Sequence, residues 1–176
     1  MVQDEGRFGR VNIPKASWAP KGIRPNVGKQ VVRQSFYVYS AVAVEKGEII
    51  SLLLPFGNTE MMNIFLKTVS ESYPGHEIIM QVDGAGWHRS KSLEIPRNIY
   101  FIQQPPYSPE VNPTEHIWDE IREKYLHNRV FKSLEDTMSR VCKALTDLRA
   151  KPEYVKSMTF FPYLNFNNGQ CPSLSV

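Results

Sequence analysis

The sequence predicts one α/β domain in which helices cover a layered β-sheet. Two strand-length runs of β-branched and aromatic residues occur in the first third of the chain. A helical segment, two further apolar strands and two amphipathic helices follow. A chain of 176 residues suits one such domain with a real hydrophobic core. We assign residues 1–159 to this domain and leave residues 160–176, which are aromatic and rich in Asn and Pro, as an unassigned C-terminal tail.

The first strands are predicted from their composition and from the turn residues between them. VQDE (2–5) predicts a short strand, and the Pro- and Gly-rich segment 14–28 predicts an ordered loop after it. The runs SFYVYSAVAV (35–44) and IISLLLPF (49–56) flank the turn residues EKGE. Such a pair predicts two antiparallel strands joined by a short turn.

The middle of the chain alternates between helix and strand. Residues 60–73 carry apolar side chains at helical spacing, and Pro74 follows them. The apolar runs EIIMQVD (77–83) and NIYFIQQ (98–104) have the length of buried strands. A short helical turn is expected between them at SKSLEI (90–95).

Two helices close the predicted domain. The segment 113–128 follows a proline-rich loop and repeats large apolar side chains on one face. A second amphipathic helix is expected to begin at Ser133, with two acidic residues in its first turn, and to continue through Leu148.

The composition is that of an ordinary globular protein, with 41% hydrophobic and 22% charged residues. No apolar run approaches the roughly 20 residues that span a bilayer. The first residues, MVQDEGRFGR, lack the apolar stretch of a secretory signal, so we expect a cytoplasmic protein. Cys142 and Cys171 form no metal-type cluster and are expected to be reduced thiols.

Positive charge is concentrated near the N-terminus. Residues 6–44 contain seven basic residues and no acidic residue, with Phe8 and Trp18 interleaved. This pattern favours contact with nucleic-acid phosphates, and the alternative is a solvated hairpin that lacks acids. The residues we expect to contact DNA are Arg7, Arg10, Lys15, Trp18, Lys21 and Arg24.

Three acidic positions are candidates for chemistry, although each alone also has an ordinary structural explanation. Asp83 follows a buried strand and precedes Gly84, where the backbone leaves the sheet. Glu115 lies in the first turn of a predicted helix, where an acidic side chain also stabilises the helix dipole. Asp4 and Glu5 are adjacent in a strand, so their side chains point to opposite faces and only one can enter a given site.

Taken together, the motifs QDE, VDGAGWH and PPYSPEVNPTEHIWDEIREK resemble the DDE transposases, in the bacterial insertion-sequence branch of the mariner-like superfamily. The third motif is the most specific, and SWAPKGIRP (17–25) resembles the loop after the family's first strand. The step of 32 positions from Asp83 to Glu115 also fits the family. The resemblance covers roughly residues 2–150 and implies an RNase H-like fold, a mixed β-sheet flanked by helices.

The resemblance implies a catalytic triad of Asp4, Asp83 and Glu115 that binds two Mg²⁺ ions, for which Mn²⁺ can substitute. Two such ions about 3.5–4 Å apart activate an attacking oxygen and stabilise a leaving oxygen, and hard cations prefer carboxylate oxygens. Family members use water to free a 3′-hydroxyl at the transposon end, and this hydroxyl then attacks target DNA. The chain departs from the family pattern at Gly84, where Asn is common.

Four further residues have less certain expected roles. His88 either orients a phosphate or a metal-bound water, or is a surface histidine in a turn. Asn112 is expected to cap the helix rather than to touch DNA. Asp119 lies one helical turn beyond Glu115 and is a possible substitute ligand, whereas Trp118 is expected in the core.

The resemblance also implies partners: DNA at the transposon ends and target, and a second copy of the chain in an active homodimer. The helix-turn-helix part that reads transposon ends in full-length relatives is expected to be separate or missing. The runner-up function is therefore a truncated, inactive transposase remnant that binds at most DNA or a partner. A third possibility, an independent RNase H-like nuclease, fits the acidic triad but not SPEVNPTEHIW (108–118).

Overall fold

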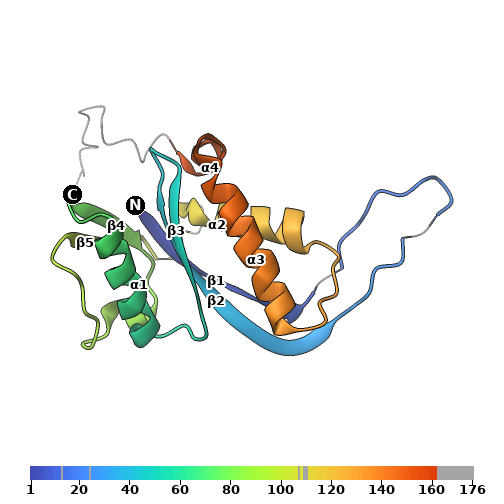
Figure 1. Ribbon diagram of the computed structural model, residues 1–176, viewed down its shortest axis with the longest axis horizontal. Coiled ribbons are helices and arrows are strands. Elements are labelled where there is room, and N and C mark those ends of the chain that lie inside the picture. The colour runs from blue at the N-terminus through green and yellow to red at the C-terminus, as the bar shows by residue number, and fades with distance from the viewer. Residues whose placement is uncertain (13, 24, 107, 109–110, 162–176) are drawn as a thin grey trace.

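The computed structural model describes residues 1–161 apart from residues 13, 24, 107, 109 and 110. Its five strands form one sheet in the order β3-β2-β1-β4-β5 (Figure 1). The strands are β1 (Val2–Val11), β2 (Val31–Ala43), β3 (Glu48–Leu54), β4 (Ile78–Val82) and β5 (Ile99–Gln103). The helices are α1 (Thr59–Ser72), α2 (Thr114–Glu120), α3 (Leu134–Arg149) and α4 (Pro152–Thr159).

The sheet is mixed, as the resemblance implies. β1 lies at its centre, antiparallel to β2 on one side and parallel to β4 on the other. β3 extends the antiparallel side as the predicted hairpin, and β5 extends the parallel side. The predicted α/β class with a mixed sheet flanked by helices is confirmed.

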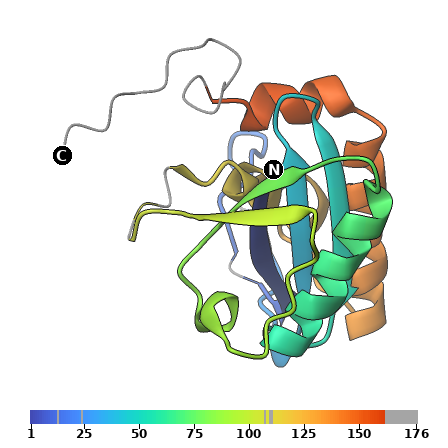
Figure 2. The ribbon, with the colours of Figure 1, turned by 90° about the vertical axis from the view of Figure 1, so that its left-hand side faces the viewer.

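Helices cover both faces of the sheet, and each face has its own apolar core (Figures 1 and 2). On one face α1 packs Met62, Phe65 and Leu66 against alternate residues of β2, β4 and β5. On the other face α2, α3 and α4 pack around Trp118 and against Val2 and other residues of β1 and β2. Of the candidate carboxylates, Asp4 therefore lies on the central strand between two packed layers.

The first strand is longer than VQDE, so the prediction of a short strand there was wrong. β1 continues to Val11 and pairs with β2 from Val2↔Val42 to Val11↔Val31, with a register shift after Gly9. A side chain at Gly9 would collide with the backbone of Gln34. The two strands are thus held in close contact along charged and glycine-rich residues that do not look like a buried strand in the sequence.

The helices differ from the prediction at three places. SKSLEI (90–95) forms no helical turn, and a 3-10 turn occurs earlier at η1 (Gly86–Arg89). The predicted helix 113–128 is divided into α2 and a π-helical segment, η3 (Ile121–Leu126). α4 was not predicted, and it begins at Pro152, whose ring suits a first helical position.

The helix caps agree with the sequence. Asn58 Oδ1 accepts a hydrogen bond from the Met61 amide at the start of α1. Ser133 and Asp136 form a capping box at the start of α3. In the part of the chain that the structure describes, no helix has both the length and the apolar character needed to cross a membrane.

Candidate active site

Asp4 is the third residue described in β1 and its side chain is buried against α2. Its Oδ2 atom accepts a hydrogen bond of 2.8 Å from the indole Nε1 of Trp118. Burial raises the pKa of Asp4 from 3.8 to about 6, and the carboxylates of Glu5 and Glu115 add to this effect, although the Trp118 bond opposes it. The structure therefore holds Asp4 in a place where its negative charge is costly.

Asp83 lies directly after the end of β4 and is half-exposed. Its Oδ1 atom accepts a hydrogen bond of 2.9 Å from the Ala85 amide and lies 2.8 Å from His88 Nδ1. The hydrogen bond from His88 is the main reason that the pKa of Asp83 is lowered. This carboxylate is therefore held in its charged form.

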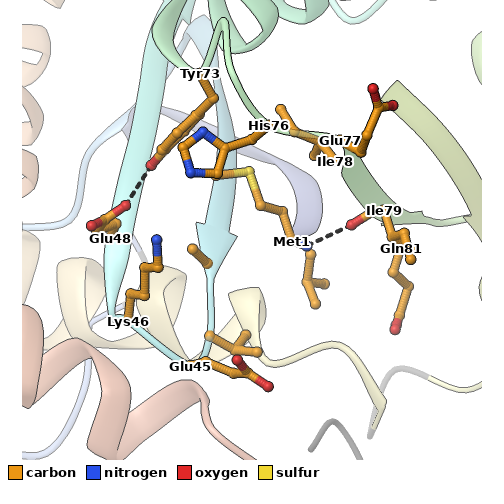
Figure 3. Close-up of a pocket in the computed structure, with 13 residues that line it drawn as sticks. Met1, Glu45, Lys46, Glu48, Tyr73, His76, Glu77, Ile78, Ile79 and Gln81 are labelled. Atoms are coloured by element: carbon orange, nitrogen blue, oxygen red, sulfur yellow. Dashed lines mark hydrogen bonds between the residues drawn. The ribbon is translucent and has the colours of Figure 1, made fainter. Parts of the chain in front are cut away.

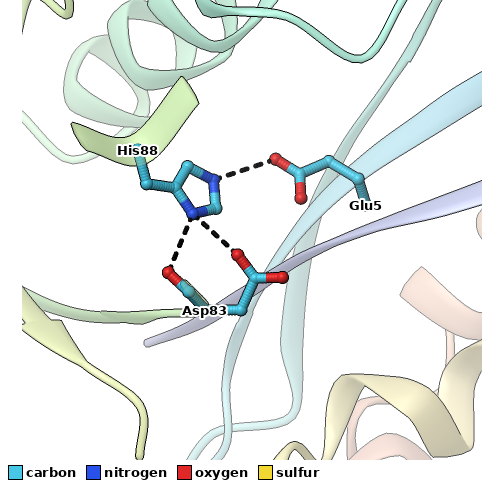
Figure 4. Close-up of side chains that lie close together, drawn as sticks. All are labelled: Glu5, Asp83 and His88. Carbon is cyan, nitrogen blue, oxygen red and sulfur yellow. Dashed lines mark hydrogen bonds and ion pairs between the residues drawn. The ribbon is translucent and has the colours of Figure 1, made fainter. Parts of the chain in front are cut away.

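His88 is buried between two carboxylates (Figure 4). Its Nε2 atom lies 3.2 Å from Glu5 Oε1, on the opposite side of the ring from Asp83. Burial disfavours the imidazolium, but the bonds to Asp83 and Glu5 outweigh it and raise the pKa of His88 to about 10. The interpretation of His88 as a surface histidine is therefore wrong.

Glu115 occupies the first turn of α2, as predicted, and about half of its side chain is exposed. Arg122 Nη1 lies 4.0 Å from Glu115 Oε2 and 3.6 Å from Asp119 Oδ1. The Arg122 guanidinium also lies over the ring of Phe8, 5.4 Å from its centroid. The carboxylates of Glu115 and Asp119 thus both lie beside the guanidinium of Arg122 at the exposed side of the helix.

The strand register brings the two predicted aspartates to one level of the sheet. Val2 pairs with Gln81 in the parallel β1–β4 ladder, so two residues further along Asp4 comes level with Asp83. Glu115 is close enough to contribute to the raised pKa of Asp4. The three predicted carboxylates therefore come from β1, from the end of the adjacent strand β4 and from α2, and their ligand atoms do not all lie within 4.8 Å of one another.

The tightest cluster of possible metal ligands in the described part of the chain is a different one. Ligand atoms of Glu5, Asp83 and His88 all lie within 4.8 Å of one another. Asp4 is excluded from this cluster because it points to the other face of β1. The sequence left the choice between Asp4 and Glu5 open on pattern alone, and the structure gives each a distinct set of neighbours.

The residues of the site fit a hard divalent cation. The predicted donors are carboxylate oxygens with no thiolate among them, which is the ligand set of Mg²⁺ or Mn²⁺. Asp4 is buried near two further carboxylates, and its raised pKa shows that this negative charge lacks compensation by the protein alone. A bound cation would supply that compensation.

Two supporting positions have clear local roles. Asn112 Oδ1 accepts a hydrogen bond from the amide of Thr114, the first residue of α2, but the N-cap position is Pro113, so Asn112 lies one residue before the cap that was predicted for it. At Gly84, a side chain would meet the guanidinium of Arg89 at 2.9 Å, and Arg89 donates to the Gly84 carbonyl. A side chain at position 84 would therefore displace only the flexible end of Arg89.

The predicted DNA-contacting residues divide between the sheet and a long loop. Arg7 and Arg10 lie on β1, where Arg10 donates hydrogen bonds to the Phe131 and Lys132 carbonyls. The described residues between Asn12 and Gln30 form a loop that extends far from the domain (Figure 1), and it exposes Lys15, Trp18 and Lys21. Arg24 lies outside the described residues.

A basic cavity of about 240 Å³ lies between β1 and the segment after η3. Arg7, Arg10 and Lys15 line it together with Arg122, His127 and Arg129, which come from the other end of the sequence. Arg122 links this cavity to Glu115. One side chain that lines the cavity therefore also lies beside a predicted catalytic carboxylate.

A more apolar cavity of about 400 Å³ lies elsewhere (Figure 3). It is bounded by Met1, the end of β2 and the beginning of β4, and Tyr73 donates a hydrogen bond to Glu48 there. Functional groups in such sheets gather at the carboxyl ends of parallel strands, where Asp83 lies, rather than at their beginnings. None of the predicted catalytic residues lines this cavity.

A family model described as DDE superfamily endonuclease matches residues 1–138. The chain belongs to this family. An uncharacterized protein of Sinorhizobium fredii, y4pE/y4sA, is 36% identical over 123 residues, which are 69% of this chain and 91% of that protein. The DDE endonuclease domain thus includes all three predicted carboxylates.

Solved structures of the Mos1 transposase share the fold of this DDE endonuclease domain. The Mos1 paired-end complex with left transposon end matches with a TM-score of 0.59 and 16% identity, over 89% of this chain and 54% of that one. The pre-cleavage Mos1 transpososome matches with a TM-score of 0.61 and 15% identity, over 91% of this chain and 56% of that one. The chain thus spans about half the length of these transposases and has the RNase H-like fold of their catalytic domains.

The sequence did not predict the contacts of four residues at the site. Glu5 and Trp87 lie beside His88, whereas Trp118 and Arg122 lie beside Asp4 and Glu115. A Trp assigned to the core needs an acceptor for its indole N–H, and this requirement could have directed attention to Trp118. Nothing in the local sequence signals the contacts of Glu5 or Arg122, because their partners are distant along the chain.

Proposed function

We propose that this chain is the catalytic domain of a DNA transposase, which cleaves and joins DNA strands with Asp4, Asp83 and Glu115 as its metal-binding carboxylates. The observation that carries the proposal is the strand register, which sets Asp4 level with Asp83 beneath the helix that bears Glu115. Membership of the DDE endonucleases supports the choice of reaction.

Two Mg²⁺ ions are the proposed cofactors, with Mn²⁺ as a substitute. Two of the Mos1 complexes with this fold are described as complexes with Mn and with Mg. Divalent cations bound here would activate the attacking oxygen and stabilise charge on the leaving oxygen of a phosphodiester. The buried Asp4 would anchor them, while the more exposed Asp83 and Glu115 complete the set from the side that DNA can reach.

DNA is the proposed substrate, and the basic cavity is its proposed binding surface. Arg7, Arg122 and Arg129 are exposed there, and Arg122 stands beside Glu115. A DNA strand that follows these cations would pass directly from the cavity to the carboxylates. The Mos1 structures of this fold include a paired-end complex with a transposon end and a strand transfer complex, which supports DNA as the partner.

We further propose that the chain acts as a homodimer, with a separate helix-turn-helix part that reads the transposon ends. The loop 12–30 is the proposed contact with the second copy or with DNA, because Trp18 at its surface is fully exposed. A large aromatic side chain in this position is typical of a residue that is covered by a partner. The proposed location is the cytoplasm, on the nucleoid when DNA is bound.

The first test is a calorimetric titration of the chain with Mn²⁺ beside Asp83→Ala. Binding that disappears in the variant would support an assembled carboxylate site. A folded wild-type chain that binds no Mn²⁺ would refute the proposal and favour the inactive remnant.

The second test is metal-dependent nicking of supercoiled DNA. Asp83→Asn and Glu115→Gln should abolish nicking because each removes a metal-binding charge. Asp119→Asn is the matched control, because Asp119 is on the same helix and shares Arg122 but is more exposed. Equal loss of nicking in Asp119→Asn and Glu115→Gln would show that the third carboxylate has been assigned wrongly.

A further inference from the structure

A buried bridge of hydrogen bonds links Asp83 to the opposite face of β1. His88 Nδ1 meets Asp83 Oδ1 at 2.8 Å, and His88 Nε2 meets Glu5 Oε1 at 3.2 Å. The side chains of His88 and Glu5 are 1% and 4% exposed, whereas that of Asp83 is 40% exposed. The bridge therefore has a buried end at Glu5 and an accessible end at Asp83.

The buried end is saturated with donors. Glu5 Oε1 accepts hydrogen bonds from Gln3 Nε2 at 3.0 Å and from Trp87 Nε1 at 3.2 Å, in addition to the contact with His88. A metal ion at this oxygen would have to displace several buried donors and leave them without partners, which is costly. Glu5 thus has the environment of an anchor rather than of a metal ligand.

The geometry of the imidazole supports the same conclusion. Its two nitrogens point in different directions, one toward Glu5 and one toward Asp83 (Figure 4). A single ion cannot take the place of both contacts while His88 keeps this orientation. The cluster is therefore explained by hydrogen bonding along the ring and does not need an ion at its centre.

At the accessible end, His88 Nδ1 bonds the main-chain carbonyl oxygen of Asp83 at 3.1 Å and lies 2.8 Å from its carboxylate Oδ1. Oδ1 also accepts a hydrogen bond from the Ala85 amide, and among the described residues Oδ2 makes no hydrogen bond. The two donors fix the rotation of the carboxylate and leave Oδ2 for another partner. Because Asp83 follows the last residue of β4, no ladder hydrogen bond of the sheet holds it in place.

We propose that Glu5 and His88 are positioning residues that hold Asp83 in the orientation needed to bind a divalent cation. This inference rests on the proposed function, since it assumes that Asp83 is a metal ligand. Buried partners that orient a ligating side chain commonly change metal affinity by about 10–100-fold when they are removed. Asp4 would then bind the metal directly, and its neighbour Glu5 would act on Asp83 through His88.

Two substitutions at His88 separate the halves of the bridge. The amide nitrogen of Asn can take the place of Nδ1, so His88→Asn keeps a donor for Asp83 and loses the contact with Glu5. The longer Gln can place its amide nitrogen near Nε2, so His88→Gln keeps the contact with Glu5 and loses the donor for Asp83. Both variants are neutral and polar, and each is the control for the other.

The experiment is a Mn²⁺ titration by calorimetry, with thermal unfolding in EDTA measured on the same samples. We expect His88→Gln to weaken Mn²⁺ binding by about 10-fold or more, and His88→Asn, which loses only the contact with the Glu5 anchor, to weaken it by a smaller factor of about 3. A role confined to folding predicts instead that both variants lose stability alike and bind Mn²⁺ as wild type does once folded. Glu5→Gln is a second variant for the anchor and should also weaken binding.

The outcomes distinguish this inference from the proposed function. If wild type binds Mn²⁺, Asp83→Ala abolishes binding, and His88→Gln and Glu5→Gln bind as wild type does, only the positioning role is refuted. If wild type binds no Mn²⁺, the proposed function and this inference both fail. In the metal-free protein, the Nδ1–H signal of His88 in NMR spectra should shift in Asp83→Ala, because only the bond to the main-chain carbonyl of residue 83 then remains, and an unchanged signal would also contradict the bridge.

Discussion

Replacing Asp4 by Asn should stabilise the metal-free protein while removing its ability to bind metal. Asp4 is buried, and its pKa rises from 3.8 to about 6 chiefly because burial penalises the charged form. At neutral pH the native state therefore holds a carboxylate that is more easily ionised in the unfolded chain. Asn has the same shape and still accepts the hydrogen bond from Trp118, but it carries no charge.

The size of the effect follows from the shifted pKa. One pKa unit corresponds to about 1.4 kcal/mol, so ionised Asp4 costs the native state about 3 kcal/mol. The amide N–H groups of the variant would be buried without assigned partners, which costs about 1 kcal/mol. The net gain in the free energy of unfolding is about 2 kcal/mol, or a rise in Tm of about 4–8 °C for a chain of this size.

The pH dependence has a definite sign. The cost of Asp4 is absent below pH 3.8, where both states are protonated, and it grows until the pH exceeds about 6. Wild type therefore loses stability relative to Asp4→Asn as the pH rises through this window. Above pH 6 the difference should be constant.

The assay is urea denaturation in EDTA at several pH values between 4 and 8, with Glu115→Gln as control. That variant also removes one negative charge from the site, but Glu115 is half-exposed, so its stability should stay within about 0.5 kcal/mol of wild type. Added Mn²⁺ should stabilise wild type and leave Asp4→Asn unchanged. An Asp4→Asn variant that is no more stable than wild type at pH 7.5, or whose advantage does not vary with pH, would refute the reasoning.

Three further predictions concern neighbouring features. Gly6→Ala should destabilise the protein by about 1–3 kcal/mol and weaken Mn²⁺ binding, because a Cβ there would approach the Trp118 ring at 2.8 Å. Urea denaturation measures the change in stability, and calorimetry measures the change in Mn²⁺ affinity. Ser133→Ala should cost about 1 kcal/mol through loss of the α3 capping box, with Mn²⁺ affinity unchanged; a changed affinity would show that α3 is coupled to the site. Arg129→Gln should weaken DNA binding and reduce the slope of the logarithm of the DNA-binding constant against log salt by about 1. Arg97 is exposed outside the basic cavity, so Arg97→Gln should change neither quantity. Equal effects of the two variants would argue against the cavity as the DNA path.

The sequence by itself determined the strands, most helices and the identity of the candidate carboxylates. Alternating or continuous apolar residues marked β2 to β5, and capping residues marked the starts of α1 and α3, because these signals act over a few neighbouring residues. The length of β1 escaped prediction because its polar and glycine residues are paired by distant parts of the chain. The helix α4 was missed for a related reason, since its buried residues contact elements far away in sequence.

Only the tertiary structure decided how the candidate site is assembled. Asp4 and Glu5 are neighbours in the sequence, and alternation along a strand predicts that they diverge, but it does not say what each one meets. Packing against α2 gave Asp4 the indole of Trp118, and the turn after β4 brought His88 between Asp83 and Glu5. The contacts of Asp4 with Trp118 and of Glu5 with His88 join residues more than 80 positions apart. They depend on strand order and helix packing, which no local pattern of residues encodes.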